Sequence, residues 1–185
     1  MSEPIVQGPP EEQGICVICG LCCDGTIFRH GHLKPGEKES VPGKMTEEIY
    51  VENNEEYFLL PCYYFRGRCS IYSQRRAEVC GTYRCQLLKD FAAGSITEAA
   101  SAEVIRNALA LRDSIIDEYR RISGKEEDIS FRLLITDLGR LIRTATEESA
   151  GGVQYDMLLA RCNIFEMLLI KHFRSAEDFE KMIMR

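Results

Sequence analysis

Cysteine is the residue type whose number and spacing predict chemistry in this sequence. Nine cysteines occur in 185 residues, and four of them lie in the stretch GICVICGLCCDG, residues 14–25. Four more follow in PCYYFRGRC and SIYSQRRAEVCGTYRC, which together cover residues 61–85. In a reducing cytosol disulfides seldom persist, so clustered cysteines there indicate metal binding or redox chemistry. The candidate metal ligands are Cys16, Cys19, Cys22, Cys23, Cys62, Cys69, Cys80 and Cys85.

The first group has a spacing that suits metal binding. Two residues between successive cysteines let neighbouring sulfurs converge on one metal, as in zinc sites and in the start of ferredoxin-type motifs. Cys23 follows Cys22 at once, so the ferredoxin pattern is not continued, and the two adjacent side chains are expected to serve different metals unless one bridges. Eight sulfurs suit two tetrahedral sites, or one cluster with some left over. The spacing fits zinc, iron or an iron–sulfur cluster equally well.

The second group is expected to complete a site begun by the first, because its cysteines are too widely spaced to close one by local turns. It also lies in a basic region. Residues 61–93 contain 6 basic and 2 acidic residues, a net charge of +4, whereas residues 1–60 contain 4 basic and 11 acidic residues, a net charge of −7. Thiolates around cations carry surplus negative charge, which arginines can offset through hydrogen bonds to sulfur. The alternative is that they are solvated or pair with the acidic N-terminal segment. The candidates are Arg66, Arg68, Arg75, Arg76 and Arg84.

The chain divides into three regions by pattern. Residues 1–14 are rich in Pro, Gly and Glu and are predicted to be a flexible leader. Residues 15–93 have frequent turn signals, such as Pro35-Gly36 and Asn53-Asn54, and three short runs that suit strands, TIFRH, EEIYVE and EEYFLLP. This region has little apolar sequence for its length, so metal is expected to hold it together.

Residues 94–185 are predicted to form a small antiparallel helical bundle, because apolar residues recur there at helical spacing. Ser123-Gly124 and Gly151-Gly152 are expected to separate three helices. Their apolar faces include Ile105, Ala108, Ile115 and Tyr119; Phe131, Leu134, Ile135 and Leu138; and Leu158, Cys162, Phe165 and Leu169. The predicted fold class is therefore mainly α, with an irregular cysteine-rich metal-binding half that contains short strands and packs on a small helical bundle.

The two cysteine motifs resemble those of the CxxCxxCC family, described as zinc- or iron-chelating cysteine-cluster proteins. The family's first motif matches the cysteines of residues 16–23. Its second motif, C-x-I-Y-x-x-R-P-x-x-C-R, resembles CSIYSQRRAEVC from Cys69 to Cys80, with Arg76 in place of the expected proline. Cys62 and Cys85 fit the remaining positions, so the resemblance covers roughly residues 15–90.

This resemblance implies a metal-binding protein whose centre serves structure or assembly. It also implies an alternative, since one branch of the family is similar to flagellin lysine N-methylases, which are linked to an iron–sulfur cluster and S-adenosylmethionine. The chain would then be an iron–sulfur enzyme, a lysine N-methylase-like or redox component. No G-x-G-x-x-G follows a predicted strand, and the chain is short for a complete methylase. No catalytic residue is assigned.

Histidines, a ninth cysteine and several aromatic residues are further candidates for ligands or contact surfaces. His30 and His32 can ligate zinc or iron, but eight thiols make them unnecessary, and a surface loop is the favoured position. Cys162 lies on an apolar helical face and is predicted to be a core residue. Aromatic residues interleaved with arginine can bind single-stranded nucleic acid. A net charge of −6 favours instead a small core that shields the metal, formed by Tyr63, Tyr64, Phe65, Tyr72 and Tyr83.

The N-terminal segment MSEPIVQGPPEEQG lacks the basic start and apolar core of a secretory signal. The longest apolar stretches, such as MLLARCNIFEMLLI, are interrupted by polar and charged residues. A cytoplasmic protein is therefore expected, with a metal ion as its ligand, no membrane contact and no specific nucleic acid. A protein partner is left unidentified.

Overall fold

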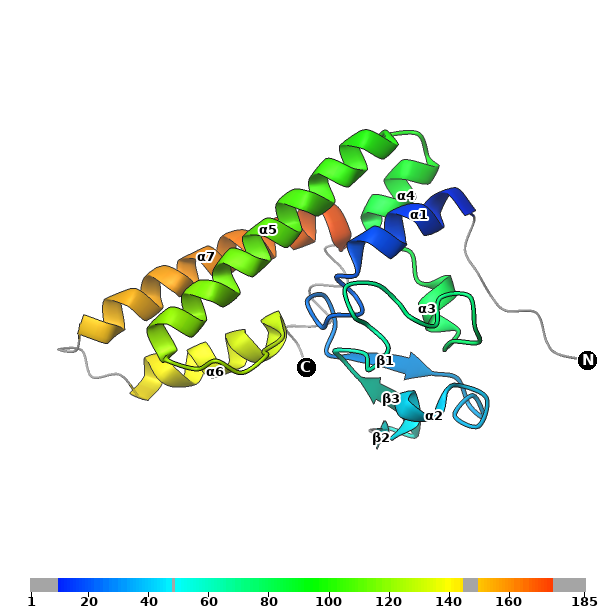
Figure 1. Cartoon of the computed structure of the whole chain (residues 1–185), viewed down its shortest axis with the longest axis horizontal. Coiled ribbons are helices and arrows are strands. Elements are labelled where there is room, and N and C mark those ends of the chain that lie inside the picture. The colour runs from blue at the N-terminus through cyan, green and yellow to red at the C-terminus, as the bar shows by residue number, and fades with distance from the viewer. Residues whose placement is uncertain (1–9, 48, 145–149, 175–185) are drawn as a thin grey trace, which may run out of the picture. The chain divides into compact units, whose positions relative to one another are not determined.

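A computed structural model describes residues 10–47, 49–144 and 150–174 (Figure 1). The chain divides into two units, residues 1–98 and 99–185. The described residues contain seven helices and one three-stranded sheet, which confirms the mainly α class. None of the described helices has the length and apolar character needed to cross a membrane.

The first unit is built from short elements. Their bounds are α1 Pro10–Cys19, β1 His30–Leu33, α2 Gly43–Thr46, β2 Ile49–Glu52, β3 Glu55–Leu59, α3 Val79–Thr82 and α4 Gln86–Ala92. Helix α1 starts inside the segment predicted to be a flexible leader and carries the chain to the second cysteine. The rest of that leader, residues 1–9, lies outside the described residues.

The three strands form an antiparallel sheet in the order β1-β3-β2. Strands β2 and β3 lie within the predicted runs EEIYVE and EEYFLLP, whereas β1 begins only at the last residue of TIFRH. A two-residue turn joins β2 to β3, and both of its residues have positive φ, 53° at Asn53 and 64° at Asn54. These angles are those of a type I′ turn, which matches the twist of antiparallel strands and which asparagine tolerates better than most residues.

The core of this unit lies against the sheet. Its buried cluster consists of Leu33, Val41, Met45, Phe58, Ile71 and Ala77. Gly31 on β1 makes room for the Phe58 ring, because a Cβ there would lie 2.3 Å from it. Half-buried Cys62, Cys69 and Cys80 pack against the cluster, so sulfur forms part of the wall of this small core.

The second unit consists of α5 Glu98–Ser123, α6 Phe131–Thr144 and α7 Ala150–Phe173 (Figure 1). Gly151-Gly152, predicted to lie between helices, falls in the first turn of α7, so its helix begins earlier than the sequence suggested. The predicted apolar faces supply the interior: Ile105, Ile115 and Tyr119 from α5, Leu134 and Leu138 from α6, and Leu158, Cys162 and Phe165 from α7 are all buried.

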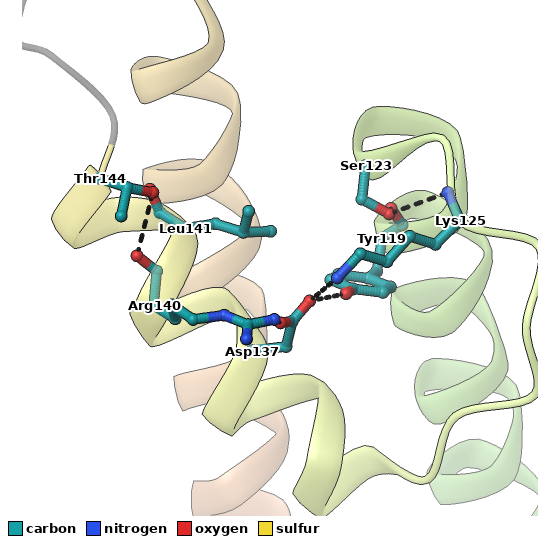
Figure 2. Close-up of polar contacts among 7 residues, drawn as sticks. All are labelled: Tyr119, Ser123, Lys125, Asp137, Arg140, Leu141 and Thr144. Atoms are coloured by element: carbon teal, nitrogen blue, oxygen red, sulfur yellow. Dashed lines mark hydrogen bonds and ion pairs between the residues drawn. The ribbon is translucent and has the colours of Figure 1, made fainter.

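Polar contacts also join these three helices. Arg161 of α7 donates hydrogen bonds to Glu118 and Ser114 of α5. Figure 2 shows the Asp137 carboxylate of α6 facing Tyr119 of α5 and Lys125 of the following loop, both of which donate to it. The carboxylate therefore ties α6 to the end of α5.

Candidate metal centre

The first cysteine group straddles the end of a helix. Cys16 and Cys19 lie in the last turns of α1, where the amide of Gly20 donates to the carbonyl oxygen of Cys16 at 3.4 Å. Gly20 has a φ of 65°, the left-handed conformation that commonly ends a helix. The chain then turns, with the amide of Asp24 donating to the carbonyl oxygen of Gly20 at 3.0 Å, so Cys22 and Cys23 lie in a turn and not on the helix.

The second group is joined directly to the first through the backbone. The amide of Cys62 donates a hydrogen bond of 2.8 Å to the carbonyl oxygen of Cys23. Next to this contact, the Phe65 ring lies against Gly20, where a Cβ would be 2.5 Å from the ring. Phe65 also forms an isolated bridge with Cys69. The two cysteine groups, far apart in the sequence, therefore meet at this turn.

Cys16, Cys19, Cys22 and Cys85 are electrostatic neighbours. Cys85 is the N-cap residue of α4, and α4 packs against α1. Burial is the main cause that raises the pKa of the Cys16, Cys19 and Cys22 thiols, and the charge of Cys85 raises each further. The pKa of Cys85 itself is raised by burial, against the opposing effect of the Leu88 and Leu87 backbone N–H groups. We call these four residues the α1–α4 set.

Cys23, Cys62, Cys69 and Cys80 are neighbours of one another in the same way. The pKa of Cys23 is raised by burial first and then, in decreasing order, by Cys80, Cys16, Cys62 and Cys69. Burial raises the pKa of Cys80 to about 12, and Cys62 and Cys69 add to this effect. We call these four residues the core-side set. The two sets adjoin, because Cys16 contributes to the pKa of Cys23.

All nine cysteines are free thiols. Across residues 10–47, 49–144 and 150–174, no three Cys, His, Asp or Glu side chains have the arrangement of a formed metal site. In this structure the eight thiols are thus neighbours that do not yet converge on common points. Cys162, the ninth, is buried in the second unit as predicted, and burial raises its pKa to about 12.

Among the five candidate arginines, Arg76 best fits the predicted role of offsetting thiolate charge. Its charge opposes the burial that raises the pKa values of Cys16 and Cys80. The guanidinium lies 4.1 Å from the centroid of the Tyr72 ring, and its Nε is buried with no hydrogen-bond partner among the described residues. A buried donor of this kind, next to two thiols, can serve a thiolate.

Arg84 instead pairs with the acidic N-terminal segment, which was the alternative to contact with sulfur. It pairs with the carboxylate of Glu12, which is only 8% exposed and belongs to the acidic N-terminal segment. Arg66 donates to the carbonyl oxygen of Phe65 at 2.8 Å, and its charge slightly opposes the raised pKa of Cys62. Nothing in the sequence pattern pointed to Glu12, because its burial depends on the packing of α1 against the later helices.

The histidines do not lie in a surface loop as predicted. His30 and His32 are on β1, where their rings contact the Tyr57 ring. The Nδ1 of His30 is 2.7 Å from the hydroxyl of Tyr50, and the Nε2 of His32 is 4.0 Å from Glu55. Because side chains alternate along a strand, His30 and His32 lie on one face of the sheet, and the register of β1 with β3 pairs His32 with Tyr57 in an aromatic cluster.

Two of the aromatic residues predicted to shield the metal line a small pocket beside the thiols. Tyr72 and Tyr83 border it together with Cys16 and Cys80, and its volume is about 20 Å³. A space of this size admits roughly one water molecule. Tyr63, by contrast, is 53% exposed and contributes little to a core. Cys16, which borders this pocket, is the most exposed cysteine of the eight.

Comparison with known proteins assigns no family to this chain. No family model, curated protein or solved structure matches the chain.

Proposed function

We propose that residues 10–98 form a metal-binding module of the CxxCxxCC type, in which eight cysteines hold zinc or iron. The iron form includes an iron–sulfur cluster. The centre serves the structure of this unit or the assembly of the protein. The observation that carries the proposal is the meeting of two cysteine groups distant in the sequence, joined by the 2.8 Å hydrogen bond between Cys62 and Cys23.

We assign the ligands to the two sets of four described above. The α1–α4 set contains Cys22 and the core-side set contains Cys23, in keeping with adjacent side chains that serve different metals. Packing supports this division, because α1 lies against α4, while Cys62, Cys69 and Cys80 share one apolar cluster. Four thiolates suit a tetrahedral zinc site, and four cysteines also suit an iron–sulfur cluster.

The chemistry of the surroundings fits such a group. Sulfur ligands suit zinc and iron, and the buried Nε of Arg76 offers an unused donor to a thiolate beside it. Bound cations would stabilise the thiolate forms of the ligands. The side chains must turn toward common points for this, which agrees with the coupling of metal binding to folding in small cysteine-rich domains.

The test is anaerobic purification of the full chain, followed by metal analysis and an optical spectrum. We expect about two zinc ions per chain, since each tetrahedral site takes four thiolates. A brown protein with iron and acid-labile sulfide would identify the iron–sulfur form instead. A folded, native preparation with neither metal would overturn the proposal.

Matched serine variants test the two sets. Cys85→Ser and Cys80→Ser should each remove about half of the bound metal, because each affects one set of four. Cys162→Ser should leave the metal content unchanged, since Cys162 lies in the second unit. If Cys85→Ser and Cys80→Ser each remove all of the metal, there is one centre, and the division into two sets is wrong.

A further inference from the structure

Helix α7 has a second apolar face that points to solvent. Val153, Met157, Ile164 and Met167 are between 63% and 66% exposed, and Ala160 between them is exposed as well. Successive members are four, three, four and three residues apart, which is the spacing of a coiled-coil seam. We call these five residues the α7 stripe.

The stripe is distinct from the face that builds the helical unit. Leu158, Cys162, Phe165 and Leu169 are buried on the opposite side of the same helix. Helix α7 is thus apolar on both sides, and a helix that is apolar all round is usually buried. The outward face of α5 differs, since it carries the charged residues Glu103, Arg106, Asp113, Asp117 and Arg121. The exposure of the stripe is therefore a property of α7 and not of the unit in general.

Charged residues near the two ends of the stripe have opposite signs. Asp156 lies beside its N-terminal end, and Lys171 continues its spacing at the C-terminal end; both side chains are exposed. Two parallel copies of α7 would bring Asp156 next to Asp156 and Lys171 next to Lys171. Two antiparallel copies bring Lys171 of each within about one helical turn of Asp156 of the other. Charge complementarity therefore selects the antiparallel arrangement.

The same arrangement also matches the sizes of the apolar side chains. When two copies are aligned about residue 162, the midpoint between Val153 and Lys171, Met157 lies opposite Met167. The small Ala160 then lies opposite the larger Ile164. Large and small side chains therefore face each other, as knobs-into-holes packing requires. The same patch faces itself, as a two-fold symmetric interface requires. Methionine is enriched at such interfaces.

We propose that the α7 stripe is a homodimer interface, in which α7 pairs antiparallel with α7 of a second copy of this chain. The inference depends only on the second unit and is independent of metal binding. It assigns Asp156 and Lys171 to ion pairs between the two copies and the five stripe residues to the apolar seam.

The oligomeric state of the full chain is the first measurement. Sedimentation and light scattering should detect a dimer when the protein concentration is raised to about 100 μM. Dissociation constants up to this value are typical of weak to moderate interfaces. Ala160→Glu should weaken the dimer by at least about 100-fold, because it buries an unpaired carboxylate on each side of the seam. Ala110→Glu makes the same change on the exposed face of α5 and should leave the dimer intact. Circular dichroism of both variants checks that the helices remain.

The orientation is tested by zero-length carbodiimide cross-linking of the wild type. Asp156 and Lys171 are separated by about 22 Å along one helix, so a direct link between them must join two chains. We expect this link in the dimer band and its loss in Asp156→Lys, with association restored in the double variant Asp156→Lys/Lys171→Asp. A monomer at all concentrations, a dimer unaffected by Ala160→Glu, or a dimer without the link would each overturn the proposal.

Discussion

The backbone amide of Cys62 donates a hydrogen bond to the carbonyl oxygen of Cys23, and the two atoms are 2.8 Å apart. This contact fixes where the second cysteine group meets the first. Gly20 and Phe65 reinforce it from the side, since the ring occupies the space that a side chain at Gly20 would need. The chain thus brings its two cysteine groups side by side through main-chain geometry.

Metal removal should affect the two units differently. We expect a chelator to expose residues 10–98 to protease while the helices of the second unit stay protected, because the first unit has a small core whose wall includes sulfur. Structural zinc contributes roughly 10–16 kcal/mol in small domains, which exceeds what such a core supplies. Limited proteolysis with mass spectrometry, alongside circular dichroism, measures this. Continued protection of the first unit after complete metal loss would contradict the expectation.

Gly20→Ala should destabilise the first unit by about 2–4 kcal/mol, since it combines a left-handed backbone with a collision against Phe65. Gly36→Ala is the control for the backbone alone. Gly36 also has positive φ, but a Cβ there meets nothing within 4 Å, so we expect about 1–2 kcal/mol. Urea unfolding followed by circular dichroism compares the variants. Equal losses at the two positions would show that the contact with Phe65 contributes nothing.

Gly14→Ala should stabilise the same unit by about 1 kcal/mol. Gly14 is an exposed position inside α1, and alanine has the better helix propensity. A Cβ there meets nothing within 4 Å. The measurement is the urea midpoint at constant slope. A loss of stability would mean that α1 is not helical at this position.

The stability of the second unit should depend on pH through the Asp137 carboxylate. Hydrogen bonds from Lys125, Tyr119 and Arg140 lower its pKa to about 2 from an ordinary value of 3.8. Its contribution to stability is therefore complete above about pH 4 and is lost as the pH falls through 2. Asp137→Asn should cost about 1–3 kcal/mol at pH 7, the range for hydrogen bonds to a charged group.

The difference between wild type and Asp137→Asn should shrink toward zero near pH 2, where the wild-type carboxyl becomes protonated. Thermal unfolding at several pH values follows it. Asp128→Asn is the matched control, because Asp128 is fully exposed and solvent screens its pair with Arg120 at 3.0 Å, so little change in stability is expected. A difference between wild type and Asp137→Asn that does not change with pH would exclude the ionised carboxylate as its source.

Arg132 of α6 and Glu166 of α7 form a largely buried ion pair at 2.6 Å. Removing one partner alone leaves a buried charge uncompensated, so Glu166→Gln should destabilise the second unit by about 3–5 kcal/mol. The double variant Arg132→Leu/Glu166→Leu should recover most of this loss, since apolar replacement of a buried pair is often neutral. Urea unfolding of the three proteins provides the comparison. A double variant as unstable as Glu166→Gln would argue against this account.

Helical periodicity in the second half predicted the buried faces correctly, because the spacing of Phe131, Leu134 and Leu138 fits one side of a helix only. It was less informative for α7, where two apolar faces occur in one helix. The face with Leu158, Cys162 and Phe165 was recognised, but the α7 stripe was not. Periodicity reports that apolar residues share a side; it does not report which side meets a neighbouring helix.

Local pattern also predicted the turn at Asn53-Asn54, since a turn depends on the backbone preferences of a few residues. It misplaced His30 and His32, whose position depends on the register of β1 with β3. The resemblance to the CxxCxxCC motif expected proline at Arg76. The consequence of having arginine at this position is visible only in the folded chain, where the charge of Arg76 acts on Cys16 and Cys80.

The sequence by itself therefore determined the mainly α class and the buried faces of the three long helices in the second half of the chain. These follow from residue type and from spacing within a few turns of backbone. The tertiary structure decided which thiols become neighbours, that Arg84 pairs with Glu12, that the Nε of Arg76 is buried with no hydrogen-bond partner among the described residues, and which face of α7 stays exposed. Each of these depends on contacts between segments far apart in the chain, whose energies local spacing does not encode.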